Sequence, residues 1–205
     1  MHSLLGNIRS LVTRVAPGGR TEETVHPLDE PLRLLGLERR ALRGDVHVHS
    51  GRIVELASVA KPIELVTSDL ALYAQWVGSA TVAAAHVEMP LPERPWPGRA
   101  VETLADLTEA ERIDVERARH ALLFGDASAV EGYRAVVEKV HAPFRANVFA
   151  LRSLYVAAGA QVVVTGLPAV LVVDRVTIEE LGQLTLVTAC RAWINRLEKK
   201  PAAAH

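Results

Sequence analysis

Two histidines one residue apart are the residues of this sequence whose types and spacing could support chemistry. They lie in the stretch Gly44-Asp-Val-His-Val-His-Ser-Gly-Arg-Ile-Val-Glu-Leu56. Successive side chains of a strand point to opposite faces, so His47 and His49 share one face, where two imidazoles could bind a divalent metal ion. Val46 and Val48 share the other face. With the Ser-Gly turn that follows, this alternation also predicts an edge strand of a β-hairpin.

The order Asp45-x-His47-x-His49-Ser50 resembles the first motif of the PHP phosphoesterase family and, more loosely, that of the amidohydrolases. In those families the motif ends the first strand of a barrel, and its histidines share a metal ion. The resemblance implies that His47 and His49 are metal ligands of a metal-dependent hydrolase, and it puts Asp69 near another family position. Where the family has Thr-Asp-His, this chain has Thr67-Ser-Asp-Leu70. The repeated strand–helix units of a barrel are not evident.

Other motifs of catalysis or cofactor binding are not evident. The sequence contains no Gly-x-Gly-x-x-Gly, P-loop, Gly-x-Ser-x-Gly or Cys-x-x-Cys motif. Glu138 and His141 have the Glu-x-x-His spacing of di-iron helix bundles, but such a site needs a second motif and two further inward-facing glutamates. We therefore predict no catalytic and no cofactor-binding residue, and the question of a cofactor stays open.

Charge and cysteine content bound the partners and the compartment. Lys and Arg number 23 and Asp and Glu number 24 in 205 residues, so no broad positive field is available for a phosphate backbone, and general nucleic-acid binding is not expected. Cys190 is the single cysteine. One thiol cannot form an internal disulfide, which favours a reducing, cytoplasmic compartment. The uncharged segment 153–173 reaches the length of a membrane span, so membrane association is a third alternative.

The chain divides into four parts. Residues 1–19 form an amphipathic N-terminal arm, because apolar residues recur at helical spacing before a Pro-Gly-Gly stop. Residues 20–89 form an N-terminal part with the predicted hairpin and a long buried helix over 70–87. Residues 90–99 contain four prolines, which block helix and central strand, and form a linker. Residues 100–205 form a helical C-terminal part with a short hairpin.

Most of the C-terminal part is expected to be helical. Thr108 and Glu111 form a capping box that starts one helix, and Gly125 is a natural end for it. Two β-branched runs, Val162–Thr165 and Ala169–Val173, predict a hairpin around a Gly-Leu-Pro turn. No period of about 20 to 50 residues repeats, so a solenoid is not expected. Asp126 and Ser128 are start signals for a further helix, and helical spacing predicts another from Phe144. Thr177 and Glu180 form a second capping box, which predicts the start of a final helix.

These patterns predict a mainly helical α+β fold, in which packed helices accompany one or two small β-hairpins. Long uncharged runs of Ala and Val would leave large apolar patches on a monomer, and such patches are normally buried against partners. We therefore expect a non-catalytic structural or interaction subunit of a homo- or hetero-oligomer, with other proteins or copies of itself as partners. A metal-dependent hydrolase that uses His47 and His49 is the alternative.

Overall fold

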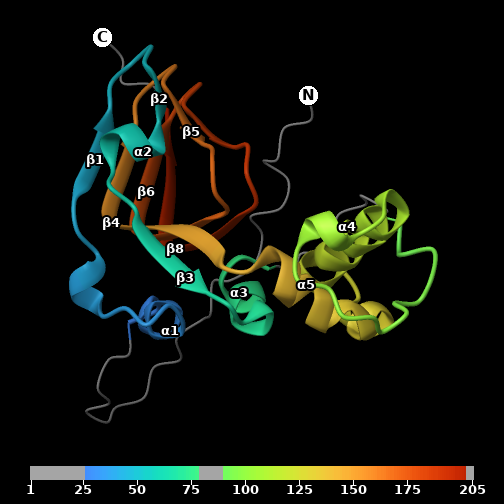
Figure 1. Cartoon of the computed structure of the whole chain (residues 1–205). Coiled ribbons are helices and arrows are strands. Elements are labelled where there is room, and N and C mark those ends of the chain that lie inside the picture. The colour runs from blue at the N-terminus through green and yellow to red at the C-terminus, as the bar shows by residue number, and fades with distance from the viewer. Residues whose placement is uncertain (1–25, 79–89, 202–205) are drawn as a thin grey trace.

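The chain folds around stacked parallel strands (Figure 1). The computed structural model describes residues 26–78 and 90–201. One sheet has the strand order β1-β4-β6-β8, with β3 paired to β4, and the other has the order β2-β5-β7. The strands are β1 (Asp45–Val48), β2 (Ile53–Glu55), β3 (Ile63–Thr67), β4 (Phe144–Val156), β5 (Gln161–Val164), β6 (Ala169–Glu179), β7 (Gln183–Leu186) and β8 (Cys190–Lys200). The helices are α1 (Asp29–Leu34), α2 (Leu56–Val59), α3 (Leu70–Val77), α4 (Glu109–Phe124) and α5 (Arg134–His141), with short 3-10 helices at Arg39–Ala41, Leu104–Asp106 and Ala127–Tyr133.

The parallel strands are the sides of successive coils. Ser153 of β4 lies opposite Arg175 of β6, which lies opposite Arg196 of β8. In the second sheet, Gln161 lies opposite Gln183. Equivalent residues of successive coils form a row across the parallel strands, and along the chain they are about 22 residues apart. This arrangement is a β-solenoid, in which each coil contacts only its neighbours.

Each coil turns a corner in the middle of its long strand. The pairing of β4, β6 and β8 is interrupted at residues 152, 174 and 195. In β4, odd-numbered residues face the interior before this corner and even-numbered residues face it afterwards. Phe149 and Leu151 are buried in the core between the sheets before it, and Leu154 and Val156 are buried there after it. The coil therefore has three faces, made by the two halves of the long strand and by the shorter strand of the second sheet.

The first coil is incomplete and closes one end of the solenoid. β1 runs parallel to the second half of β4, whereas β3 runs antiparallel along its first half. Between them, α2 follows β2 directly, and its Leu56 is fully buried in the core between the sheets. In Figure 1, α2 lies at the near end of the coils and β8 at the far end. This helical turn shields the apolar interior from water, as the capping units of solenoids do.

A layer of helices is inserted between the first and second coils. α3, α4 and α5 lie between β3 and β4 in the chain. α3 packs against the outward side of the long strands, and α4 and α5 pack beside it (Figure 1). Val148 and Val170 of the strands share one buried core with Tyr73 of α3. Gly78 follows α3 where the chain approaches the end of α4. A Cβ at this position would lie 2.7 Å from the carbonyl oxygen of Leu123, so the close approach requires glycine.

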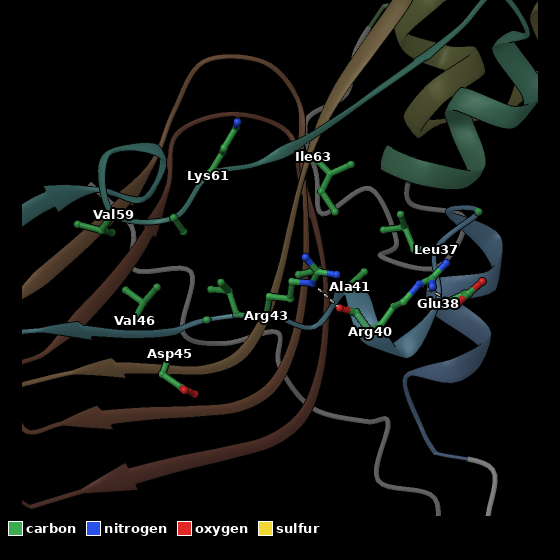
Figure 2. Close-up of a pocket in the computed structure, with 15 residues that line it drawn as sticks. Leu37, Glu38, Arg40, Ala41, Arg43, Asp45, Val46, Val59, Lys61 and Ile63 are labelled. Carbon is green, nitrogen blue, oxygen red and sulfur yellow. Dashed lines mark hydrogen bonds and ion pairs between the residues drawn. The ribbon is translucent and has the colours of Figure 1, made fainter.

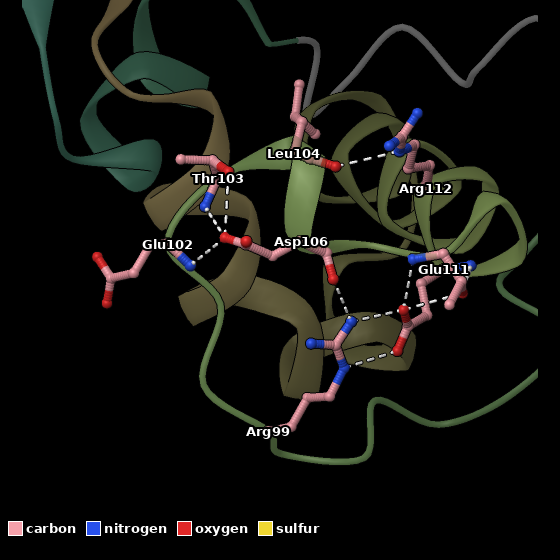
Figure 3. Close-up of polar contacts among 8 residues, drawn as sticks. Arg99, Glu102, Thr103, Leu104, Asp106, Glu111 and Arg112 are labelled. Carbon is pink, nitrogen blue, oxygen red and sulfur yellow. Dashed lines mark hydrogen bonds and ion pairs between the residues drawn. The ribbon is translucent and has the colours of Figure 1, made fainter.

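α4 begins and ends where the sequence predicts. The N–H of Thr108 donates a 2.8 Å hydrogen bond to the Glu111 carboxylate, and the Thr108 hydroxyl accepts one from the N–H of Glu111. Arg99 donates two hydrogen bonds, of 2.9 and 2.6 Å, to the same carboxylate (Figure 3). These bonds, that of Arg99 first, lower the pKa of Glu111 to about 2. The predicted capping box, the helix and its end at Gly125 are confirmed.

The prediction of a mainly helical α+β fold with small hairpins is wrong, because the core of the chain is a pair of parallel sheets. The segment predicted as a helix from Phe144 is β4, and the segment from Thr177 contains the end of β6 followed by β7 and β8. Neither predicted hairpin forms. β1 and β2 belong to different sheets, as do β5 and β6, because each strand pairs with the next coil instead of its neighbour in the chain.

The expectation that the chain is not a solenoid is also wrong. Leu154, Val176 and Leu197 occupy equivalent positions of three coils, yet what they share is apolar character, not identity. Rows that share only apolar character leave no fixed motif that would reveal the repeat in the sequence. Among the described residues, no helix is long and apolar enough to cross a membrane, and the uncharged segment 153–173 consists of strands and their turns.

Two sequence predictions fall outside the described residues. They are the amphipathic arm at 1–19 and the second half of the helix predicted over 70–87, whose first half is α3. Residues 90–99 contain neither helix nor strand. The division of the chain into parts at this segment stays a prediction.

Candidate functional site

The last coil exposes the apolar residues that face the interior of the solenoid. In the preceding coil, the inward-facing residues are at most 1% exposed: Val162, Val164, Ala169, Leu171, Val173 and Val176. The residues that follow them in the same rows of the last coil are all partly or largely exposed: Leu184, Leu186, Cys190, Ala192, Ile194 and Leu197. Within 26–78 and 90–201, no further strand pairs with β7 or β8. The solenoid is therefore open at this end.

Leu197 gives the clearest contrast along one row. It follows Val176 and Leu154, and the three side chains are 45%, 1% and 1% exposed. The open end also presents the outer edges of β7 and β8, which pair with no further strand of the described residues. The backbone N–H and C=O groups of such edges form a template for another strand. An apolar row that ends in water beside unpaired strand edges is a surface suited to covering by protein.

Charged residues lie on the opposite side of β8 from Leu197. Arg196 is the row neighbour of Arg175, and neither guanidinium has an ion-pair partner in the described part of the chain. Glu198 lies 3.9 Å from the Lys200 ammonium nitrogen. Like charges that face each other across neighbouring strands are destabilising. The two arginines therefore favour an additional anionic group at this edge.

Cys190 is also an inward-facing residue of the last coil, packed against the core between the sheets. Burial raises the pKa of its thiol to about 12. A thiol with so high a pKa carries almost no thiolate at neutral pH and is a poor nucleophile. The residue therefore acts as a small apolar side chain of the core.

The two histidines lie on the side of β1 that the alternation predicts. Val46 and Val48 are buried, and the imidazoles of His47 and His49 stack on the other side with 4.7 Å between ring centroids. β1 is an edge strand, as the pattern predicts. The described residues contain no group of three or more His, Cys, Asp or Glu side chains that could hold a metal ion. The pair supplies two imidazoles, and its assignment as a metal site stays a prediction.

The carboxylates of the motif have other partners. Asp45 accepts hydrogen bonds of 2.6 Å from Arg152 and 2.7 Å from Ser153, both on β4. Asp69 is the N-cap of α3 and accepts a 3.0 Å hydrogen bond from the N–H of Leu72. Both interactions hold the local fold together, and the parallel strands form stacked coils instead of the barrel that the PHP resemblance implies.

Sequence reasoning missed two neighbours of the histidines. Tyr155 lies beside His47, with 4.4 Å between ring centroids, and its hydroxyl donates a hydrogen bond to Glu179. The N–H of Ala158 donates a second bond, of 2.9 Å, to that carboxylate. These bonds, that of Tyr155 first, lower the pKa of Glu179. The pairing of His47 with Tyr155 could have been found only from the register of the coils.

A groove of about 610 Å³ lies between the segment that leads into β1, the segment between α2 and β3, and the middle of β4 (Figure 2). Its lining includes the apolar residues Val46 and Leu151 and the cationic residues Arg40, Arg43 and Lys61. Arg43 donates a 2.9 Å hydrogen bond to the carbonyl of Arg40. Figure 2 shows the Arg43 and Lys61 side chains extending in different directions. Cations that do not converge on one point give no basis for assigning an anionic ligand.

No family model, curated protein or solved structure gives a match to the chain. No activity, substrate or partner can therefore be carried over from a relative, and the function has to follow from the geometry of the open end and of the histidine pair.

Proposed function

We propose that the protein is a non-catalytic structural subunit that self-associates through the open end of its solenoid. The observation that carries the proposal is the exposure of the inward-facing apolar residues in the last coil. Each of these residues continues a row that is fully buried one coil earlier. Another coil stacked on β7 and β8 would bury them and would pair the free edges of both strands.

A second copy of the chain is the occupant that fits this end best. It presents the same outline of three faces, the same spacing of strands and the same inward-facing apolar residues. Burial of apolar surface provides the driving force, and edge-to-edge hydrogen bonds provide direction. The single cysteine supports the further proposal of a cytoplasmic location, because one thiol cannot form an internal disulfide.

Light scattering coupled to size-exclusion chromatography tests the proposal on the full chain. We expect the wild type to be oligomeric and Leu197→Glu to be monomeric with an unchanged far-UV circular dichroism spectrum. Ile113→Glu on α4 is a matched control, because Ile113 and Leu197 are both 45% exposed. It should leave the assembly intact. A wild type that is monomeric at every concentration, or equal effects of the two substitutions, would overturn the proposal.

The alternative function, a metal-dependent hydrolase, is favoured by one observation, the stacking of His47 and His49 on one face. Elemental analysis separates the two functions when the protein is purified without a metal-binding tag, beside a His47→Ala/His49→Ala double variant. Near-stoichiometric zinc, manganese or iron that disappears in the double variant would support the hydrolase. Metal at trace level in both samples would leave the pair as part of an edge strand.

A further inference from the structure

The charges of β8 indicate how the second copy is placed. We propose that two copies pair β8 against β8 in antiparallel orientation, across a two-fold axis at Leu197. This inference rests on the proposed self-association and adds the orientation, the register and the stoichiometry. It predicts a closed dimer, because the same surface is used by both copies.

The two ends of the solenoid differ, which argues against a head-to-tail filament. A filament needs the open end of one copy to stack on the first coil of the next. That first coil is occupied by α2, whose Leu56 fills the interior and is fully buried. β1 and β2 contribute short edges of four and three residues there. Of the two ends of the solenoid, as residues 26–78 and 90–201 form them, only another open end therefore gives the open end an apolar counterpart.

A two-fold axis perpendicular to the solenoid reverses the direction of every strand, so β8 of one copy runs antiparallel to β8 of the other. With Leu197 on the axis, each Leu197 faces its equivalent on the inward side, in continuation of the row through Val176 and Leu154. On the outward side, Arg196 of each copy lies opposite Glu198 of the other. Opposite charges that face each other across an antiparallel pair are stabilising.

Other registers lose this complementarity. A slip that centres the axis on Arg196 puts the two Arg196 side chains opposite each other. A slip that centres it on Glu198 opposes the two Glu198 side chains and sets Arg196 against Lys200. A slip by a single residue exchanges the inward and outward sides of the strand. The register at Leu197 also supplies the anionic group that the neighbouring Arg175 and Arg196 lack within the described residues of one copy.

Charge reversal tests the register on the full chain. Arg196→Glu would oppose Glu198, and Glu198→Arg would oppose Arg196, so each single variant should weaken the dimer at least about tenfold through its two symmetric contacts. The double variant Arg196→Glu/Glu198→Arg restores both contacts with their signs exchanged. Its dissociation constant, measured by analytical ultracentrifugation, should return to within about threefold of the wild type.

Cross-linking gives an independent readout that does not depend on charge. Residues directly opposite in an antiparallel pair have Cα atoms about 4.5 to 5.5 Å apart, which suits a disulfide. In a Cys190→Ala background, Leu197→Cys should form a disulfide-linked dimer under mild oxidation. Val187→Cys, in the exposed turn after β7, is the matched control and should stay monomeric on non-reducing gels.

The outcomes separate this inference from the proposed function. Rescue by the double variant together with the Leu197→Cys dimer would support the two-fold pair. If the wild type is oligomeric and Leu197→Glu makes it monomeric, but neither the rescue nor the cross-link is observed, the register is overturned and the proposed function stands. A monomeric wild type would overturn both.

Discussion

The row Leu154–Val176–Leu197 predicts a gradient of stability along the solenoid. Leu154 and Leu197 are the same residue type in the same row, but they are 1% and 45% exposed. Leu154→Ala removes buried atoms and leaves a cavity between the sheets, which should lower the free energy of unfolding by about 2 to 5 kcal/mol. Leu197→Ala removes a side chain that is only about half buried. It therefore loses roughly half of the transfer free energy of about 1.5 to 3 kcal/mol for burying a leucine, and it leaves no enclosed cavity. We expect a loss of about 1 kcal/mol.

Urea unfolding followed by circular dichroism measures both losses. At high dilution, where the protein is monomeric, the two substitutions should differ by at least about 1 kcal/mol. At high concentration the loss caused by Leu197→Ala should grow, because a second copy covers this side chain and stabilises the folded state by mass action. The loss caused by Leu154→Ala should not change. Equal losses in dilute solution would show that Leu197 is as enclosed as Leu154 and would refute the open end.

Two further predictions concern the helical layer. Gly78→Ala should lower the melting temperature by several degrees, because the added Cβ would meet backbone oxygens at the junction of α3 and α4. Gly132→Ala is the control and should change the melting temperature little, because no atom lies within 4 Å of the added Cβ. Glu111 should make stability depend on pH. Its pKa is lowered from 4.5 to about 2, first by the Arg99 hydrogen bond, so its contribution is complete above about pH 4.5 and is lost as the pH falls toward 2. Urea titrations between neutral and acidic pH should show a shallower loss for Glu111→Gln than for the wild type.

Each of these predictions has a specific contrary result. Equal melting temperatures for the two glycine variants would mean that α3 and α4 do not approach as closely as described. For the pH series, Glu109→Gln in the same turn of α4 is the control, because Glu109 is exposed and its ion pair is long, at 4.0 Å. If it flattens the pH dependence as much as Glu111→Gln does, the Arg99 contact is not the cause.

Local signals in the sequence correctly predicted α4 and the two sides of β1. α4 is bounded by the Thr108–Glu111 capping box and by Gly125, and the two residues of the capping box are only three positions apart. The alternation around His47 correctly placed the imidazoles on one side of an edge strand and the valines on the other. Patterns of this kind depend on the geometry of one element, which a short window of sequence contains.

The long strands were mistaken for helices because each coil turns a corner and because β4 is apolar on both faces. Alternation holds separately in each half of β4, so the inward-facing positions 149 and 151 are followed by 154 and 156. The step of three residues at the corner turns a period of two into a pattern that fits a helix as well. In addition, Phe144 and Val148 face the helical layer, whereas Leu151 faces the core between the sheets. Apolar residues from both faces of β4 thus recur at helical spacing within one strand.

The open end could not be predicted from residue types. Leu197 is as apolar as Leu154, and what differs is the absence of a further strand beyond β8 among the described residues. The partners of β1 are equally remote from any local pattern, since Asp45 bonds to Ser153 at a separation of 108 residues. Such pairings become visible only when the register of the whole solenoid is known.

The insertion of the helices between the first two coils has a consequence for synthesis. β6 and β8 each pair with a strand that was synthesised about 22 residues earlier. β1, in contrast, leaves the ribosome 108 residues before the part of β4 that it pairs with. At about 5 to 20 residues per second, this delay is on the order of 5 to 20 seconds. Val46 and Val48 have no sheet to cover them during that interval. We therefore expect the nascent first coil to be the segment of this chain that depends most on chaperones.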